Sequence, residues 1–146
     1  MDTRSKVYLY HTTVKWTDHR KGMMSCEGKP NVEVATPPEF KGHEGIWSPE
    51  DLFVASANIC LMTTFIAVAE RAGLAFSAYE SAAEGRLELV EGKFQFTAIT
   101  IKPTITLESD ADAARAKELI EKAEANCLIS NSMKATVTLE PVIHSL

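Results

Sequence analysis

The sequence predicts an α+β fold in which antiparallel sheets pack on a long buried central helix, with a second helix beside them. Three observations lead to this prediction: strand-like alternation near both ends, a long uncharged helical segment between them, and an amphipathic helix in the second half. The order of strands, long helix, hairpin, helix and strand is typical of the α+β class. The 146 residues fit one domain, which we expect to span residues 1–146.

The N-terminal part predicts three short strands. From Val7 to Trp16, apolar and polar side chains alternate, and aromatic and β-branched residues are frequent, which favours a strand. The polar residues 17–22 predict a turn, Met23–Cys26 a second strand and Val32–Ala35 a third. Residues 36–47 contain two prolines and two glycines, so we expect a loop there.

A helix start follows this loop. Ser48 is a favourable N-cap, Pro49 suits the first helical position, and the two acidic residues that follow favour the positive end of the helix dipole. We expect the helix to run to about Ala72, because Gly73 provides a stop.

Eighteen residues of this helix, Leu52–Ala69, carry no charge, which reaches the lower limit of a transmembrane span. Polar side chains interrupt the segment and two acids precede it, so a buried helix of a soluble protein is favoured. One sheet covers only one side of a helix that is apolar nearly all round. We therefore expect a homodimer with this helix at its centre.

The second half predicts a β-hairpin and a final strand. Arg86–Val90 and Phe94–Leu107 form the hairpin strands, joined by a glycine-containing turn. Pro103 interrupts the second of these strands, which indicates an edge strand or a bulge at that position. The last strand is expected over Thr136–Val142.

A second helix is expected to begin at residues 109–112 and to end near Cys127. Its outer face should carry Lys117, Glu121 and Glu124. Its inner face should carry the apolar residues Ala113, Ala116, Ile120 and Ala123.

Charge and cysteine content exclude several classes of function. Twenty acidic residues against fifteen basic ones give a formal net charge of -5, so we expect no nucleic-acid partner. Three cysteines are too few for a disulfide scaffold, and their spacing from one another and from the four histidines does not suit zinc. Residues 1–16 contain no apolar stretch of the signal-peptide type, so we expect a cytoplasmic protein with reduced thiols and no membrane partner.

The cysteines are the candidate chemical groups. Cys60 lies in the middle of the uncharged helix, where a cysteine usually acts as a small buried hydrophobe. Cys127 lies at the polar end of the second helix, which we expect to be a more exposed site. Cys26 lies in a short predicted strand and is interpreted as structural or simply exposed.

Two motifs surround Cys60 and Cys127. Pro49-Glu50 opens the central helix, and Cys60 follows Glu50 by ten residues within an apolar stretch. Cys127, 67 residues after Cys60, is followed by Ile129-Ser130-Asn131. In this order they resemble the central-helix motif and the Cys-Pro-x-Ser motif of the OsmC/Ohr family, the osmotically inducible protein C-like and organic hydroperoxide resistance protein-like proteins. The resemblance covers essentially the whole chain, because Val14-Lys15-Trp16 is similar to the family's opening strand.

The resemblance implies an intertwined homodimer and a thiol peroxidase acting on organic hydroperoxides. Cys60 would be the peroxidatic residue, oxidised to a sulfenic acid, and Cys127 the resolving residue, which closes a disulfide. Arg20 would supply a positive charge to the thiolate, and Glu50 would hold Arg20. An external dithiol, of the lipoyl type, would reduce the pair, and no metal, haem or flavin cofactor is required. Apolar neighbours in the sequence would favour fatty or aromatic peroxides: Phe53, Ile59, Met62 and Phe65.

Three features depart from the family pattern or from simple geometry. Some members take the arginine from a later segment, and residues 36–40 contain none here, so Arg20 can equally be a solvated turn cation. Leu128 stands where the family usually has proline, which would fix the backbone and aim the thiol. Ten helical residues rise about 15 Å, so an interrupted helix, a bridging Arg20 or a group from a second subunit must connect Glu50 with Cys60.

Two other hypotheses remain open at this point. The chain could be a non-enzymatic OsmC-like protein whose apolar cavity binds a small hydrophobic ligand, with the cysteines as remnants or redox sensors. It could also be a purely structural dimer that binds no ligand.

Overall fold

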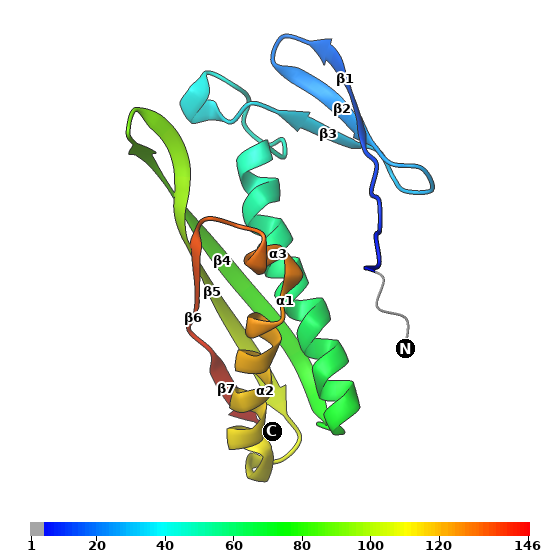
Figure 1. Cartoon of the computed structure of the whole chain (residues 1–146), viewed down its shortest axis with the longest axis vertical. Coiled ribbons are helices and arrows are strands. Elements are labelled where there is room, and N and C mark those ends of the chain that lie inside the picture. The colour runs from blue at the N-terminus through cyan, green and yellow to red at the C-terminus, as the bar shows by residue number, and fades with distance from the viewer. Residues whose placement is uncertain (1–4) are drawn as a thin grey trace. The chain divides into compact units, whose positions relative to one another are not determined.

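The structure is a computed structural model in which residues 5–146 are described (Figure 1). The chain divides into two compact units, one ending at Leu52 and the other comprising Phe53–Leu146, and each is described by itself. Residues 1–4 of the expected single domain lie outside the described residues, and the prediction of one domain stays a prediction. Strands and helices are both abundant, and the predicted α+β class is confirmed.

The first unit contains a three-stranded antiparallel sheet in the order β1-β2-β3. Its strands are β1 (Thr13–Asp18), β2 (Lys21–Ser25) and β3 (Val32–Ala35). The predicted turn over residues 17–22 is too long, because β1 and β2 stay paired to Asp18 and Lys21. The first strand was predicted to begin at Val7, which is also wrong, since residues 7–12 have no strand pairing in the described chain. Alternation alone does not make a strand when no neighbouring strand completes its hydrogen bonds.

The loop after β3 is confirmed and is closed by backbone hydrogen bonds. It contains a short 3-10 helix, η1 (Pro38–Phe40), and returns to β3, where the Ala35 N–H donates to the Trp47 carbonyl (2.9 Å). Gly42 is required at this turn, because a Cβ there would lie 1.7 Å from the Thr36 carbonyl oxygen.

The central helix, α1, spans Pro49–Ala72 without a break, so its predicted bounds are confirmed. Ser48 and Asp51 form a reciprocal cap: the Asp51 N–H donates to Ser48 Oγ (3.1 Å), and the Ser48 N–H donates to Asp51 Oδ2 (3.0 Å). At the other end, Gly73 takes a positive φ of 69°, and the Leu74 N–H donates to the Ala69 carbonyl (2.9 Å).

The second unit is built on a long antiparallel hairpin of β4 (Phe76–Val90) and β5 (Lys93–Leu107). The two-residue turn, Glu91 and Gly92, has positive φ at both positions, which matches the twist of the paired strands. The first arm was predicted to begin at Arg86 and begins ten residues earlier. Residues 76–85 are rich in Ala, Ser, Glu and Gly, which are weak strand formers, so pairing with β5 rather than propensity makes them a strand.

The last predicted strand consists of two strands, and both pair in parallel with β5. β6 (Thr136–Leu139) pairs with residues 98–101, and β7 (Val142–Ser145) with residues 104–107. The prediction that Pro103 marks an edge or a bulge is met only locally: β5 is an interior strand and its register shifts lie elsewhere, but at Pro103 it pairs only with β4. Pro103 falls between the stretches that pair with β6 and β7, where a missing N–H breaks no hydrogen bond to either strand.

The second helix, α2 (Ala113–Ala125), follows a short 3-10 turn, η2 (Asp110–Asp112), capped by the Ser109 hydroxyl. Its predicted inner face is confirmed, since Ala116, Ile120 and Ala123 are fully buried. A further short helix, α3 (Leu128–Asn131), follows Cys127 and was not predicted.

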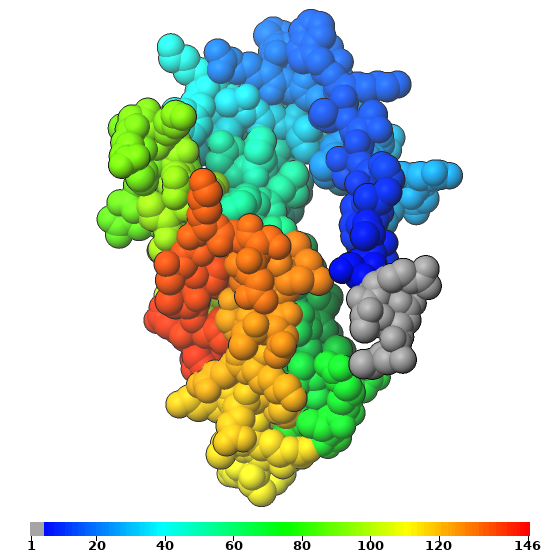
Figure 2. All heavy atoms as spheres, viewed as in Figure 1, coloured from blue at the N-terminus to red at the C-terminus, as the bar shows by residue number. Residues whose placement is uncertain are grey.

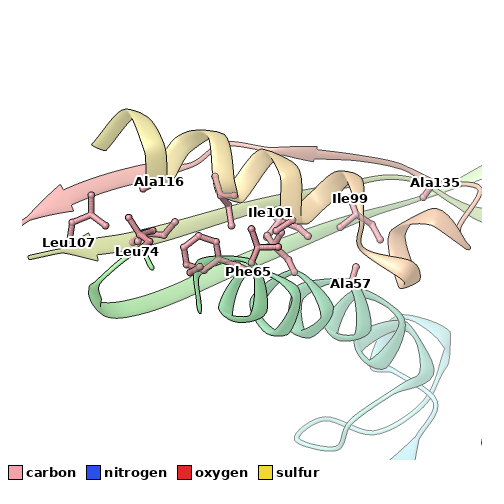
Figure 3. Close-up of a cluster of buried hydrophobic side chains, with 14 residues drawn as sticks. Ala57, Phe65, Leu74, Ile99, Ile101, Leu107, Ala116 and Ala135 are labelled. Carbon is pink, nitrogen blue, oxygen red and sulfur yellow. The ribbon is translucent and has the colours of Figure 1, made fainter. Parts of the chain in front are cut away.

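The core of the second unit gathers side chains from α1, β5 and α2 (Figure 3). Phe65 is fully buried and packs against Phe76 and Tyr79, with ring centroids 5.3 and 5.6 Å away. Other buried members are Ala57, Leu61, Val68, Ala69, Ile99, Ile101, Ile105 and Leu107.

Only one side of α1 is buried in this way. By length and composition α1 could cross a membrane, a property that it shares with core helices of soluble proteins, and 33% of its most apolar window is buried in this chain. On its other side Ile59 and Ile66, seven residues apart and therefore on one helix face, are 57% and 40% exposed. The prediction that α1 is buried all round is therefore not met by one chain alone.

We predict that Gly85→Ala lowers the free energy of unfolding by about 1–3 kcal/mol, measured by urea denaturation. A Cβ at Gly85 would lie 2.5 Å from Val54 Cγ2 on α1 and 2.9 Å from Phe96 Cε1 on β5, so the helix must move away from the sheet. Adding Val54→Ala should recover part of the loss, and the exposed Glu84→Ala should change stability by less than about 0.5 kcal/mol. A Gly85→Ala protein with the same free energy of unfolding as wild type would contradict this tight packing.

Candidate active site

Cys60 and Cys127 meet within the second unit, although 67 residues separate them in the sequence. Cys60 lies on α1, and Cys127 is the residue that precedes α3. In the space-filling view α2 and α3, yellow to orange, lie directly beside α1, green (Figure 2). The two thiols are hydrogen-bonded to each other, and neither is in a disulfide.

Cys60 is half-buried and surrounded by hydrogen-bond donors. Burial alone would raise the pKa of its thiol. The hydrogen bonds that Cys60 accepts from the Cys127 thiol and from the backbone N–H groups of Ile129 and Leu128 together outweigh this effect. The Thr64 hydroxyl, 3.8 Å from the sulfur, acts in the same direction. The pKa of Cys60 is therefore lowered below its ordinary value, contrary to the expectation for an inert core cysteine.

Cys127 has the opposite properties. We predicted an exposed position, and this is wrong: Cys127 is fully buried, because α3 turns the chain back over it. Burial raises the pKa of its thiol, and so does the hydrogen bond to Cys60. In this pair the pKa of Cys60 is lowered and the pKa of Cys127 is raised, so Cys127 is the thiol that holds its proton more tightly and donates it in the hydrogen bond.

The start of α3 explains how backbone donors reach Cys60. α2 ends at Ala125, Cys127 adopts an extended conformation (φ -71°, ψ 108°), and the chain re-enters a helix at Leu128. The first N–H groups of a helix have no partner inside it, so those of Leu128 and Ile129 are available to the Cys60 sulfur. Proline at position 128 would have no N–H, so Leu128 adds a donor that the family's usual residue lacks.

A pocket of about 440 Å³ opens between α1 and α2 beside this pair. Thr64, which contacts the Cys60 sulfur, forms part of its wall. The remaining lining residues combine apolar, basic and amide side chains: Val68, Arg71, Ala72, Leu119, Lys122 and Asn126. The pocket therefore offers apolar surface together with two basic side chains, Arg71 from α1 and Lys122 from α2, close to the Cys60 sulfur.

Arg20 and Glu50 belong to the first unit. Arg20 is an exposed residue in the β1–β2 turn, and its Nη1 donates to the Phe40 carbonyl (3.1 Å), which connects the turn with η1. Glu50 lies in the first turn of α1, and its Oε1 is buried without a hydrogen-bond partner among the described residues. Their assignment to one site with Cys60 stays a prediction.

The continuity of α1 decides one of the geometric alternatives. An interruption between Glu50 and Cys60 is excluded, because the helix is unbroken and its polar side chains are otherwise engaged. Ser56 donates to the Phe53 carbonyl (2.7 Å), and Asn58 exchanges hydrogen bonds with Ser81 on β4. A bridging arginine or a group from a second subunit remains as the connection.

Three groups near the thiols were not found from the sequence. Thr64 has no sequence feature that would reveal its contact with Cys60, and Ser130 was noted only as part of a motif. Glu124 was predicted to point outward, which is wrong: it is half-buried, and its Oε2 has no hydrogen-bond partner among the described residues. It lies at the edge of the inner face of α2, directly after the buried Ala123, where helical periodicity is ambiguous.

Between residues 5 and 146, no three or more His, Cys, Asp and Glu side chains gather closely enough to hold a metal ion.

Comparisons with known proteins agree on one family. The family model described as OsmC-like protein matches residues 42–142. The chain is 27% identical over 135 residues to the uncharacterized protein YmaD of Bacillus subtilis, covering 90% of each chain. It is 29% identical over 101 residues to the peroxiredoxin OsmC of Escherichia coli, covering 69% of each.

Solved structures show the same fold. An OsmC-like protein of unknown function from Vibrio cholerae matches with a TM-score of 0.86 at 21% identity, covering 93% of this chain and 100% of that one. An organic hydroperoxide resistance protein from Elizabethkingia anophelis matches with a TM-score of 0.75 at 21% identity, covering 98% and 100%.

We predict that Leu128→Pro raises the pKa of Cys60 and slows its alkylation by iodoacetamide several-fold at neutral pH. Removing the Leu128 N–H removes a hydrogen bond that favours the thiolate, so the alkylation rate should rise only at higher pH. The backbone accepts proline, because the site is the first position of α3 and the preceding residue is extended.

Leu128→Ala is the matched control, because it removes the exposed side chain and keeps the N–H. Both variants should be studied with Cys26 and Cys127 replaced by serine, so that only Cys60 reacts. Equal pH profiles for the proline and alanine variants would show that this N–H does not act on Cys60.

Proposed function

Because this chain belongs to the OsmC-like protein family, we propose that it is a thiol-dependent peroxidase that reduces organic hydroperoxides to alcohols. The observation that carries the proposal is the hydrogen-bonded pair of Cys60 and Cys127, in which one pKa is lowered and the other raised. A relative named as a peroxiredoxin and the fold of a protein named for organic hydroperoxide resistance support it.

The first step is nucleophilic attack by the Cys60 thiolate on one oxygen of the peroxide bond. The O–O bond breaks, a sulfur–oxygen bond forms, and the alkoxide leaves as the alcohol after it takes a proton. Cys60 is thereby oxidised to a sulfenic acid and the hydroperoxide is reduced. The lowered pKa of Cys60 supports this role, since a larger share of the thiol is ionised near neutral pH.

The second step uses the neighbouring thiol. Cys127 attacks the sulfenic sulfur, a disulfide forms, and the hydroxyl leaves as water. Its position within hydrogen-bonding distance of Cys60 supports this role, because little movement is needed to join the two sulfurs. An external dithiol, for which we propose a lipoyl-type reductant, then restores both thiols by two exchange steps.

The pocket between α1 and α2 supports an organic rather than an inorganic substrate. Its apolar residues, including Val68 and Leu119, can cover the hydrocarbon part of a hydroperoxide whose O–O group reaches Cys60 past Thr64. Of the apolar neighbours expected to form this wall, Phe65 is fully buried in the core and Phe53 is stacked on Phe96 (4.8 Å). The substrate surface is therefore assigned to the pocket residues.

We propose that the protein is a homodimer with α1 near its centre. We also propose that it is cytoplasmic. The apolar residues Ile59 and Ile66 are exposed on α1, as are Val14 and Trp16 on β1, and burying them against a second copy is favourable. In such a dimer Arg20 supplies the positive charge that the Cys60 thiolate needs. Glu50 then orients Arg20. The buried Oε1 of Glu50 has no hydrogen-bond partner among residues 5–146, which supports a cationic partner.

Binding of a small hydrophobic ligand without catalysis is the second candidate. A pocket of about 380 Å³ in the first unit favours it, because most of its lining is apolar. It is lined by Val14, Trp16, Arg20, Lys21, Gly22, Val34, Ala35, Thr36 and Pro49. Native mass spectrometry of the purified protein should then show a retained apolar compound.

We predict that a slight excess of cumene hydroperoxide converts the reduced protein to a form with a Cys60–Cys127 disulfide. One mole of alcohol should form from the hydroperoxide for each mole of protein. Peptide mapping and alcohol quantification measure the two products. Cys60→Ser should abolish both, because no thiolate attacks the peroxide, whereas Cys127→Ser should stop at the sulfenic acid. Cys26→Ser is the matched control and should behave as wild type. Peroxide that persists beside three free thiols would refute the enzyme proposal and favour the binding protein.

We also predict that Ile66→Glu shifts the protein from dimer to monomer in sedimentation velocity experiments. A carboxylate at this exposed position leaves one chain folded but would be buried and unpaired in the dimer. Lys117→Glu, on the exposed face of α2, is the control and should remain dimeric. A wild-type protein that sediments as a monomer at micromolar concentration would refute the dimer.

A further inference from the structure

Glu124, on α2, is a half-buried acid that the two proposed steps do not use. Its side chain is half-buried, and Oε2 is buried without a hydrogen-bond partner among the described residues. Withdrawing a carboxylate oxygen from water without a partner opposes folding. Glu121, about one turn earlier on the same helix, is exposed to solvent, so α2 also has positions where a glutamate is hydrated. Stability alone does not account for the position of Glu124.

Ser130 connects this acid with the thiol pair. Its Oγ lies 3.5 Å from Cys127 Sγ, to which it donates. The same hydroxyl interacts with the Glu124 carboxyl. Cys127 in turn hydrogen-bonds Cys60, so a carboxyl, a hydroxyl and two thiols form a series in which each group contacts the next.

The backbone holds this series in place. The Cys127 N–H donates to the Glu124 carbonyl (3.1 Å), which fixes the end of α2 against the start of α3. Ser130 lies in the first turn of α3, and the Asn131 N–H donates to the Cys127 carbonyl (3.0 Å). The three side chains are therefore positioned by one compact turn rather than by flexible segments.

The titratable groups around Glu124 come from three elements. Tyr79 faces it from β4, and its hydroxyl is also buried without a hydrogen-bond partner among the described residues. Cys127 precedes α3, and Cys60 faces Cys127 from α1. Burial raises the pKa of Glu124, and the contact with Ser130 offsets this in part. The carboxylate is therefore a stronger base than an exposed glutamate.

We propose that Ser130 and Glu124 form a proton relay that takes the thiol proton of Cys127 when Cys127 attacks oxidised Cys60. The inference rests on the second step of the proposed function. Ser130 touches the reacting sulfur, whereas Glu124 acts through Ser130 and is a positioning residue for the proton. A proton acceptor is needed because Cys127 must react as a thiolate, whereas its buried environment favours the neutral thiol.

The step balances in atoms and electrons. The Ser130 hydroxyl turns its hydrogen to the Glu124 carboxylate and accepts the Cys127 proton, since a hydroxyl both donates and accepts. The Cys127 sulfur bonds to the Cys60 sulfur while the sulfur–oxygen bond of the sulfenic acid breaks. Cys127 sulfur is oxidised and Cys60 sulfur is reduced. The leaving hydroxide takes a proton from solvent, and Glu124 later returns the Cys127 proton to solvent, so that one water molecule forms overall.

The first experiment separates the two oxidation steps in the intact protein with Cys26→Ser. After one equivalent of cumene hydroperoxide, dimedone labelling follows the sulfenic acid and peptide mapping follows the disulfide. Glu124→Gln should form the sulfenic acid at the wild-type rate and close the disulfide at least about tenfold more slowly. The rate of disulfide formation should also lose its rise with pH over the range in which Glu124 ionises.

Two variants distinguish proton transfer from a structural effect. Glu124→Asp keeps the carboxylate and should recover part of the rate of disulfide formation that Glu124→Gln loses. If Glu124 acted only through its size and shape, the shorter Asp would not recover this rate. Glu121→Gln removes an exposed charge from the same helix and should match wild type. Ser130→Ala should slow disulfide formation as Glu124→Gln does. Wild-type disulfide formation in both Glu124→Gln and Ser130→Ala would overturn the relay.

A peroxide-free measurement keeps this inference separate from the proposed function. With 5,5′-dithiobis(2-nitrobenzoate), Cys60 releases one coloured thiolate, and attack by Cys127 on the mixed disulfide releases a second. Glu124→Gln should slow only the second release. If wild type consumes no hydroperoxide but the second release depends on Glu124, the peroxidase proposal fails and the relay is supported. If peroxide is reduced but the rate of the second release is the same in wild type, Glu124→Gln and Ser130→Ala, the relay fails and the peroxidase proposal stands.

Discussion

The burial of one face of α1 is the constraint on which the second unit depends. The helix carries no charge over eighteen residues, so its inner face must pack against other apolar surface. Small residues at the contact, Ala57 and Ala69 on the helix and Gly85 on β4, allow a close approach. Once α1 and α2 share a core with β5, the end of α2 lies beside the middle of α1. The meeting of Cys60 with the start of α3 follows from this packing.

That meeting makes two chemically identical side chains different. Burial acts against ionisation at both sulfurs, but only Cys60 receives enough donors to reverse it. The donors come from the reversal of the chain at Cys127, which leaves the N–H groups of Leu128 and Ile129 without partners inside α3. The difference between the thiols therefore depends on the hydrogen bond between them and on the backbone geometry at the start of α3.

Much of the fold could be predicted from the sequence where local signals and tertiary packing agree. The bounds of α1 follow from Ser48 and Gly73, whose caps are present as expected. The length of β4 could not be predicted, because its first ten residues are strand only through pairing with β5. Motif spacing singled out the two cysteines that the fold brings together, but their predicted relative burial was reversed. Cys127 is buried by α3, a four-residue helix too short to have a periodic pattern, and Glu124 lies where helical periodicity does not decide between inside and outside.

The distribution of hydrogen bonds also bears on the direction in which the proposed cycle runs. The Leu128 and Ile129 N–H groups favour a charged Cys60 sulfur, and that charge disappears when the disulfide forms. A site that stabilises its reduced form more than its oxidised form has a more oxidising disulfide, which an external dithiol reduces more readily. Leu128 contributes to this bias through its N–H, where proline would instead restrict the backbone. Compared with proline, Leu128 therefore leaves the backbone beside Cys127 less restricted but stabilises the Cys60 thiolate. In the proposed cycle, that stabilisation would act on both the attack on peroxide and the return to the dithiol.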